Sequence, residues 1–140
     1  MISFNYEIDF EILEETIYTD WISSVIISEN KSEGEINYIF CDDDYLVEIN
    51  QQYLNHDTLT DIISFDYSLG NEIHGDIYIS IERVRENADE FKVSFEEELK
   101  RVMIHGILHY CGYKDKFEPD ELLMRSKEDE KIKLFHVKQN

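Results

Sequence analysis

Proline and glycine are scarce in this chain. One proline and five glycines among 140 residues are too few for a flexible linker or a low-complexity segment. The apolar fraction of 42% and the aromatic fraction of 13% are in turn too high for a disordered polymer. No internal repeat divides the chain. We therefore expect one folded domain over residues 1–140, a length that buries roughly two-thirds of the unfolded chain's surface.

Long apolar runs are absent as well. No stretch approaches the ~20 apolar residues that a membrane-spanning helix needs. Residues 1–15 have neither the basic start nor the apolar centre of a secretion signal. The two cysteines, Cys41 and Cys111, are expected to remain reduced thiols, as in most cytoplasmic proteins. The sequence therefore predicts a cytoplasmic protein without a membrane partner.

Basic side chains are nearly missing from the first part of the chain. Residues 1–82 carry 19 acidic side chains and one basic side chain, Lys31, whereas residues 83–140 carry 13 acidic and 12 basic ones. The net charge of -19 opposes nucleic-acid binding, because Lys and Arg must neutralise phosphates, and no DNA partner is expected. A polyanion could approach only a face built by the second part, with weak and salt-sensitive binding. The basic residues considered for that face are Arg83, Arg85, Lys92, Lys100, Arg101, Lys114 and Lys116.

Hydrophobic periodicity predicts an alternation of strands and helices. Period-two patterns indicate strands at residues 2–8, 35–41, 61–67 and 74–80, and helical spacing indicates helices at 9–28, 45–53, 81–91, 95–111 and 119–137. Asp9, Ser80 and Ser94 stand where N-caps are expected. Gly112 stands where the fourth helix should end. This order predicts an α+β fold in which helices pack against a small mixed sheet.

The stretch "HGILHYCGYKD", residues 105–115, combines two histidines, a glycine and an aspartate. His105 and His109 are four residues apart, so both imidazoles lie on one face of a helix. Gly112 would turn the chain back, and Asp115 would then approach the same point. The pattern H-x3-H-x2-G-x2-D matches the metzincin ligand scaffold with aspartate in place of the third histidine. We therefore predict a zincin-like helix and glycine turn whose three ligands, His105, His109 and Asp115, hold one Zn²⁺ or another divalent ion.

One part of the peptidase motif is missing. In HExxH enzymes the residue after the first histidine is a glutamate that acts as general base, and here it is Gly106. Three protein ligands still leave a fourth position for a water that attacks a phosphodiester, or for a phosphoryl oxygen that the ion polarises. The spacing therefore favours metal-dependent hydrolysis, with His105, His109 and Asp115 as the catalytic candidates.

Other polar residues have weaker claims to a site. Cys111 should point away from the helix face that carries the two histidines, and it is expected to be a packing residue. The remaining histidines are His56, His74 and His136. Only His56, in a polar loop, is a candidate for a supporting role. Asp61 and Asp76 stand in apolar strands, where a carboxylate is unusual, so each is expected to cap backbone or to orient another group.

Three segments of the sequence resemble the YbeY-type endoribonucleases, a family of bacterial ribosomal RNA maturation factors. The family's histidine motif, H-G-x-L-H-L-x-G-Y-D-H, is similar to "HGILHYCGYKD" here. Its segment N-x-x-Y-R-x-x-D-x-P-T-D-V-L-S-F is similar to "NQQYLNHDTLTDIISF", and G-D-I-x-I-S is present as "GDIYIS". In the two longer segments the matching residues are Asn50, Tyr53, Asp57, Thr60, Asp61, Ser64, Phe65, His105, Gly106, Leu108, His109, Gly112 and Tyr113. The segments occur in the family's order, over residues 35–120.

The resemblance implies a compact metal-dependent fold in which the motif's three ligands hold a zinc-like ion. It further implies cleavage of single-stranded RNA, maturation of the ends of small-subunit ribosomal RNA, and a role in ribosome quality control. The implied partners are ribosomal RNA and the small subunit or its associated proteins.

Departures from the family pattern include Asp115, Leu54 and Leu59, the last of which replaces the family's proline before Thr60 and Asp61. Asp115 replaces the last histidine of the motif, which keeps an ion-binding side chain but adds negative charge. Leu54 replaces the arginine that is the family's candidate phosphate contact. Lys114 and Arg83 are the candidates to take over that contact with the substrate.

Two other functions stay open on the sequence. One is a metzincin-like peptidase, which the missing glutamate disfavours. The other is a non-catalytic ribosome assembly factor whose metal is structural, which the net charge of -19 and Leu54 favour.

Overall fold

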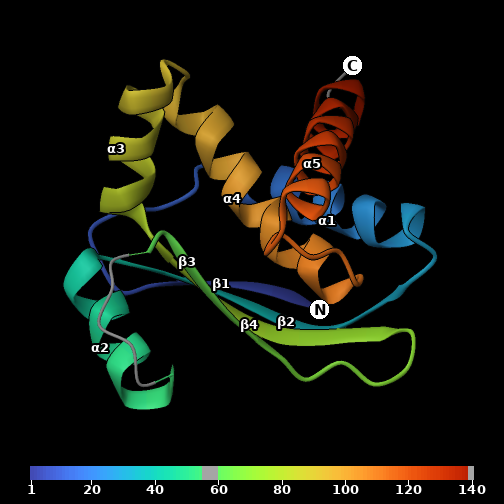
Figure 1. Ribbon diagram of the computed structural model, residues 1–140, viewed down its shortest axis with the longest axis horizontal. Coiled ribbons are helices and arrows are strands. Elements are labelled where there is room, and N and C mark those ends of the chain that lie inside the picture. The colour runs from blue at the N-terminus through green and yellow to red at the C-terminus, as the bar shows by residue number, and fades with distance from the viewer. Residues whose placement is uncertain (55–59, 139–140) are drawn as a thin grey trace.

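Strands and helices alternate along the chain in a computed structural model that describes residues 1–54 and 60–138 (Figure 1). The strands are β1 (Ile2–Tyr6), β2 (Ser32–Cys41), β3 (Ile62–Asp66) and β4 (Glu72–Ser80). The helices are α1 (Glu15–Ser28), α2 (Asp43–Leu54), α3 (Ile81–Phe91), α4 (Phe95–Tyr110) and α5 (Glu118–Lys138). These elements confirm the predicted α+β class. None of the described helices is both long enough and apolar enough to cross a membrane.

The strands form one mixed sheet in the order β1-β2-β4-β3. β1 runs parallel to β2, and β2 runs parallel to β4, with Tyr38 opposite both Phe4 and Ile77. β3 is antiparallel to β4 and places Ser64 opposite Ile77. Parallel neighbours need a crossover, and α1 supplies the one between β1 and β2. β3 pairs only with β4 among the described strands, so it lies at one edge of the sheet, beside α4.

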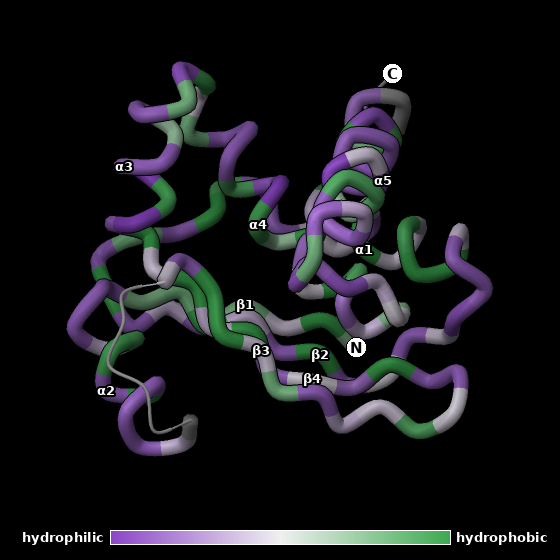
Figure 2. Tube along the Cα trace, in the orientation of Figure 1, coloured by the Kyte–Doolittle hydropathy of each residue, from purple (hydrophilic) through white to green (hydrophobic). Residues whose placement is uncertain are grey.

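The main core lies between the sheet and the helices α1, α4 and α5. Figure 1 shows these helices on one side of the sheet and α2 on the other, and Figure 2 shows hydrophobic stretches along the strands. Ile36, Tyr38 and Phe40 alternate along β2 and are fully buried against the helices. Each such side chain stabilises the fold by roughly 1.5–3 kcal/mol. The Tyr38 hydroxyl also donates to the Met103 carbonyl at 2.9 Å, which fixes α4 on the sheet.

The opposite face of the sheet carries a smaller cluster. Leu46 of α2 packs there against Cys41 and Ile63, all three buried. Cys41 and Cys111 are both free thiols. Burial raises the pKa of the Cys41 thiol to about 12, so it is an inert packing group.

Two predicted caps are confirmed. The Ser80 hydroxyl accepts from the Arg83 amide at 3.2 Å and begins α3. The Ser94 hydroxyl accepts from the Glu97 amide at 3.1 Å and begins α4, the helix that carries the histidines. Each contact satisfies one of the orphan N–H groups of a helix end.

The first helix begins later than predicted, and the Asp9 cap is wrong. α1 starts at Glu15, whereas residues 9–14 form a loop whose apolar side chains pack on the core. Phe10 packs edge-on against Phe40, and the amide of Ile12 donates to the Tyr6 hydroxyl at 3.2 Å. Tertiary packing of these apolar side chains therefore replaces the helical turn that their spacing suggested. β2 also begins at Ser32, three residues before the predicted start.

Candidate metal centre

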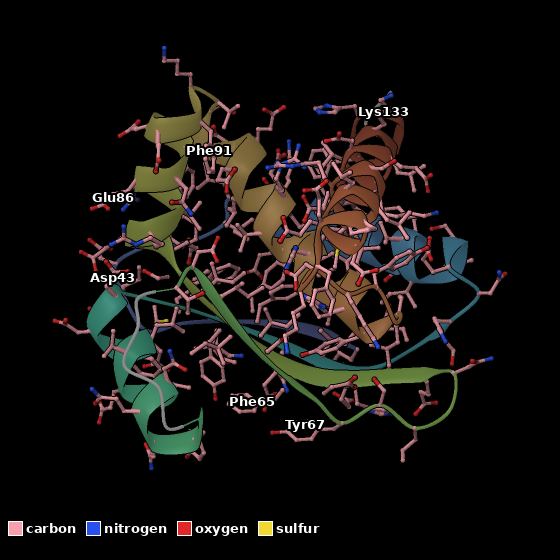
Figure 3. All side chains as sticks on the ribbon, in the orientation of Figure 1. Asp43, Phe65, Tyr67, Glu86, Phe91 and Lys133 are labelled. Carbon is pink, nitrogen blue, oxygen red and sulfur yellow. The ribbon has the colours of Figure 1, made fainter. Side chains whose placement is uncertain are left out.

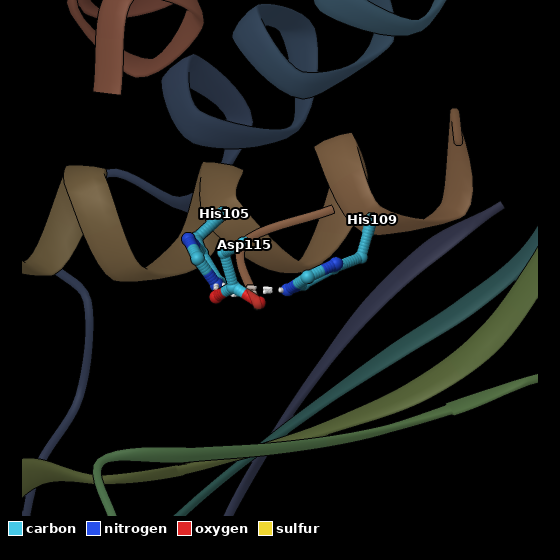
Figure 4. Close-up of side chains that lie close together, drawn as sticks. All are labelled: His105, His109 and Asp115. Atoms are coloured by element: carbon cyan, nitrogen blue, oxygen red, sulfur yellow. Dashed lines mark hydrogen bonds and ion pairs between the residues drawn. The ribbon is translucent and has the colours of Figure 1, made fainter. Parts of the chain in front are cut away.

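The last turns of α4 and the loop after it bring three side chains to one point. The Nε2 atoms of His105 and His109 lie 2.9 Å apart. Oδ2 of Asp115 lies 3.1 Å from Nε2 of His105 and 3.5 Å from Nε2 of His109. Figure 4 shows the two imidazoles pointing from α4 toward the same spot, with the carboxylate beside them. The predicted convergence of the three side chains is thus present.

The donor set fits one small divalent ion. A tetrahedral zinc with bonds of 2.0–2.1 Å separates its ligand atoms by about 3.3 Å. The three separations here, 2.9, 3.1 and 3.5 Å, bracket that value. His105 and His109 are 20% and 31% exposed and Asp115 is 44% exposed, so the site opens to solvent on the carboxylate side. The group could therefore bind an ion and leave one coordination position accessible.

A buried carboxylate orients His105. Nδ1 of His105 donates to Oε2 of Glu128 at 2.6 Å, and Oε1 of Glu128 accepts from Arg101 at 2.9 Å. This contact leaves Nε2 of His105 free to face the ion. Burial opposes the charged imidazole, but Glu128, with Asp115 and Asp61, outweighs burial and raises the pKa of His105. A metal ion therefore competes with a proton for this site, and its affinity falls at acid pH.

The glycine turn orients His109. Gly112 has φ of +105°, and its amide donates to the His109 carbonyl at 3.0 Å. The turn carries the Tyr113 carbonyl back to Nδ1 of His109, at 2.9 Å. His109 therefore presents Nε2 as its free nitrogen, and the same turn delivers Asp115.

A cleft of about 690 Å³ opens beside the three side chains. It runs along α4, with β3 and α3 on one side and α5 on the other. The lining residues are Thr60, Asp61, Ile62, Ser64, Asn87, Phe91, Glu98, Arg101, Val102, His105, His109, Asp115, Glu118, Glu121, Leu122, Met124, Arg125 and Glu128. The candidate metal centre therefore lies in the wall of a cavity large enough for a nucleotide.

The predicted substrate contacts fall in different places. Lys114 is exposed beside Asp115. Arg83 is not among the residues that line the cleft, and its guanidinium contacts Asp43 at 2.9 Å and Glu86 at 2.5 Å. Both stay predictions as substrate contacts.

Five of the seven basic residues considered for an RNA-facing surface have partners within the protein, among them Arg85 and Lys116, which lie over the rings of Phe95 and Phe117 at 5.3 and 5.8 Å. Arg83 has the two ion pairs above, and Arg101 pairs with Glu128 and Asp129. Nζ of Lys100 lies 3.9 Å from the ring centre of Phe135. The basic surface is smaller than the sequence count suggests.

The other polar residues have structural partners. Oδ2 of Asp61 accepts from the Asn87 amide at 3.3 Å, and burial raises the pKa of Asp61. Oδ1 of Asp76 accepts from the Asn37 amide at 3.0 Å, across neighbouring strands. Cys111 packs at the edge of the core.

The remaining histidines lie apart from the site or outside the described residues. Nε2 of His74 lies 2.6 Å from Glu72, and its Nδ1 accepts from the Glu35 amide at 3.0 Å. His136 is exposed on α5. His56 and the side chain of Leu54 lie outside the described part of the chain.

Sequence reasoning missed Glu128 and Glu98. Glu128 lies on α5, 23 residues beyond His105, so no local spacing connects the two. Its signal was a charged residue at a core position: Met124 and Ile132, one turn before and after it, are both buried. Glu98 stands on the His105 face of α4, two turns earlier, and is only 4% exposed. A carboxylate on the inward face of a helix was the available clue for both.

The fold and the site together define a class: an α+β protein with a zincin-like helix, a glycine turn and three convergent side chains that could hold a metal ion. A family model described as Endoribonuclease YbeY matches residues 4–136. The chain belongs to that family.

Individual relatives agree with this assignment. A Flavobacterium psychrophilum protein named Endoribonuclease YbeY is 88% identical over 140 residues, which is 100% of both chains. A Flavobacterium johnsoniae protein of the same name is 70% identical over 139 residues, covering 99% of this chain and 100% of the relative. The solution structure of TM1509 from Thermotoga maritima is similar, with a TM-score of 0.73 and 31% identity, over 99% of this chain and 91% of that one.

Proposed function

We propose that this chain is a metal-dependent endoribonuclease that cleaves single-stranded RNA. The observation that carries the proposal is the convergence of His105, His109 and Asp115 in the wall of an open cleft. Membership of a family whose relatives are named endoribonucleases supports the same activity. One Zn²⁺ per chain is the cofactor that the donor set suits, although another divalent ion fits the same ligands.

Each protein group has a defined task in this reaction. A divalent ion in the site supplies a Lewis acid for a phosphoryl oxygen and makes a coordinated water more nucleophilic. Glu128 holds His105 in the tautomer that presents Nε2, and the Tyr113 carbonyl does the same for His109. Asp115 completes the donor set with a charged ligand. The exposed Lys114 next to it is the proposed contact to the RNA backbone.

Ribosomal RNA is the proposed substrate, with maturation of small-subunit RNA ends and ribosome quality control as the biological role. The small subunit or its associated proteins are the proposed partners, and the cytoplasm is the proposed compartment. These assignments rest on the family resemblance of three sequence segments. A partner with a basic surface would also compensate for the net charge of -19, which opposes RNA binding by the chain alone.

The test is cleavage of a labelled single-stranded RNA by zinc-loaded protein beside an identically purified His109→Ala variant. We expect the wild type to cut and the variant to be inactive, because the variant lacks one of three ligands. His74→Ala is the matched control, since His74 lies apart from the site and should leave cleavage unchanged. Equal cutting by wild type and His109→Ala would assign the activity to a contaminant.

One observation favours a second candidate, an assembly factor whose metal is structural. Six carboxylates line the cleft, and they repel an RNA backbone. These residues are Asp61, Glu98, Asp115, Glu118, Glu121 and Glu128. The cleavage test separates the two candidates, because the structural role predicts that zinc raises stability while the wild type cuts no RNA. The peptidase alternative lacks a base: a Cβ at Gly106 would lie 3.0 Å from Ile77, so this position packs on the sheet.

A further inference from the structure

Glu98 is a buried residue whose carboxyl group has no hydrogen-bond partner among the described residues. It lies on α4, is 4% exposed, and lines the same cleft as His105. Within the described part of the chain it forms no ion pair, although the charges of Arg101 and Arg125 act on it from a distance. Burial, followed by the nearby charge of Asp61, raises the pKa of Glu98 to about 7. Among the described residues the one fully buried side-chain atom without a hydrogen-bond partner is Nε of Arg83, so the Glu98 oxygens keep contact with the open cleft, where they can accept hydrogen bonds from a ligand.

The donors around Glu98 point elsewhere. The Asn87 amide donates to Asp61, and the two terminal nitrogens of Arg101 donate to Glu128 and Asp129. This wall of the cleft therefore presents acceptors to a ligand. Acceptors repel phosphate oxygens but suit the N–H groups of a nucleobase.

An exposed aromatic ring and an exposed cation line the same cleft as Glu98. Phe91, at the end of α3, lines the cleft and is 52% exposed, and Figure 3 places it beside α4. Arg125, on α5, is exposed at the same cleft and makes no ion pair among the described residues. An exposed aromatic ring is a stacking platform for an unstacked base, and a free guanidinium binds a phosphate.

The spacing from the metal ligands matches one nucleotide. Glu98 precedes His105 by seven residues on α4, which is about 10 Å along the helix axis. This distance is about the same as the distance within one nucleotide from its phosphate to the far edge of its base. A phosphate at the metal centre could therefore place its base at Glu98. The cleft is continuous over this distance, because both residues line it.

We propose that this end of the cleft is a guanine pocket, in which Glu98 accepts hydrogen bonds from N1–H and N2–H of the base while Phe91 stacks on its face. Guanine is the base that offers two N–H donors side by side to one carboxylate. Arg125 then binds the neighbouring phosphate. The pocket rests on the proposed function, since it takes a nucleotide of the RNA strand whose phosphate lies at the metal centre.

Binding, measured without cleavage, tests the pocket. Four labelled oligouridine strands carry G, A, C or U at one central position and 2′-O-methyl ribose throughout, and their intact length is checked after each titration. Fluorescence polarisation with zinc-loaded wild type should show the G strand bound roughly ten-fold more tightly than the other three. Equal binding of all four strands by the wild type would overturn the pocket.

Glu98→Gln is the decisive variant. A glutamine offers one donor and one acceptor, a pattern that pairs with adenine, so the preference should move from G to A. Glu97→Gln, at an exposed position one residue earlier, should keep the preference for G. A preference for G that survives Glu98→Gln contradicts the assignment, as does a Glu98-dependent preference for another base.

Phe91→Ala tests the stacking surface. Loss of the ring should weaken binding of all four strands about five-fold or more, without changing their order. Phe117→Ala is the matched control, because Phe117 is 65% exposed and does not line the cleft. An equal loss in both variants would refute stacking at Phe91.

Failure of the pocket and failure of the proposed function give different results. Metal-dependent cleavage without base preference would retain the nuclease and remove the pocket. A Glu98-dependent preference for G without cleavage would retain the pocket in a protein that binds RNA and does not cut it.

Discussion

Glu128 links His105, a candidate metal ligand, to Arg101 through two contacts. It accepts from His105 on one oxygen and from Arg101 on the other, and its side chain is 7% exposed. The charge of this carboxylate fixes the tautomer of His105 and makes its free nitrogen a better ligand. A residue outside the histidine motif therefore controls the basicity of the motif's first ligand.

Glu128→Gln should lower zinc affinity roughly ten-fold or more, since a neutral amide orients His105 but no longer increases its basicity. Competition with a chromophoric chelator at fixed pH measures the change. Glu130→Gln, at an exposed position two residues further along α5, should leave affinity unchanged. Wild-type affinity in Glu128→Gln would show that the contact is merely structural.

Glu98 makes the free energy of unfolding depend on pH. Its pKa rises from 4.5 in the unfolded chain to about 7 in the fold. The folded state thus binds a proton that the unfolded state has released, and stability falls as pH rises through this window. The charged groups facing Glu98 are Asp61 next to β3, Arg101 on α4, and Arg125 and Glu128 on α5.

Glu98→Gln should remove this dependence. Urea unfolding of metal-free protein should give similar stabilities for variant and wild type near pH 4.5. Above pH 7 the variant should be more stable, by at most about 3 kcal/mol, because it has no buried charge to accommodate. Glu97→Gln, which is exposed, serves as the control and should follow the wild type at every pH. A constant difference between Glu98→Gln and wild type across the pH range would contradict the raised pKa.

At the scale of elements, the turn after α4 brings the residues of the candidate site together. It reverses the chain at Gly112, returns the Tyr113 carbonyl to His109 and brings Asp115 to both imidazoles. Nothing lies within 4 Å of a Cβ built on Gly112, so the requirement for glycine comes from its φ of +105° alone.

Gly112→Ala should therefore destabilise the fold by about 1–3 kcal/mol and also weaken zinc binding. Gly70→Ala is the matched control: its φ is +59°, its Cβ would also meet nothing, and it lies in the remote turn between β3 and β4. Calorimetric titration with zinc measures the zinc affinity of each variant. The Gly70 variant should lose stability but keep its affinity for zinc. Equal zinc affinities in both variants would show that the turn at Gly112 does not position the metal ligands.

Local chemistry explains which elements the sequence predicted well. Ser80 and Ser94 cap helices through contacts within three residues, and the two histidines converge because one helix carries them. The start of α1 was predicted wrongly because Phe10 and Ile12 pack in the main core as part of a loop. The spacing of apolar residues does not distinguish this packing from that of a helix. Glu128 was missed for the same reason, since its contact joins two different helices.

At the scale of the whole molecule, charge sets how RNA is held. The net charge is -19, yet the surface around the metal centre includes three cations without ion pairs among the described residues. Lys114 and Lys116 lie beside Asp115, and Arg125 lines the cleft. With so few phosphate contacts, the proposed RNA recognition would depend on the metal centre and on base contacts more than on backbone charge.

The salt dependence of RNA binding measures this number of contacts. Three neutralised phosphates on a single strand predict a slope of about -2 for log affinity against log salt. Lys116→Gln should reduce the slope by about 0.7, the contribution of one phosphate contact. Lys133→Gln, eight residues beyond Arg125 on α5, should leave it unchanged, because it lies about 12 Å further along the helix. A slope near zero would exclude phosphate contacts by these cations, whereas a slope of about -5 would require a basic surface that the described residues do not offer.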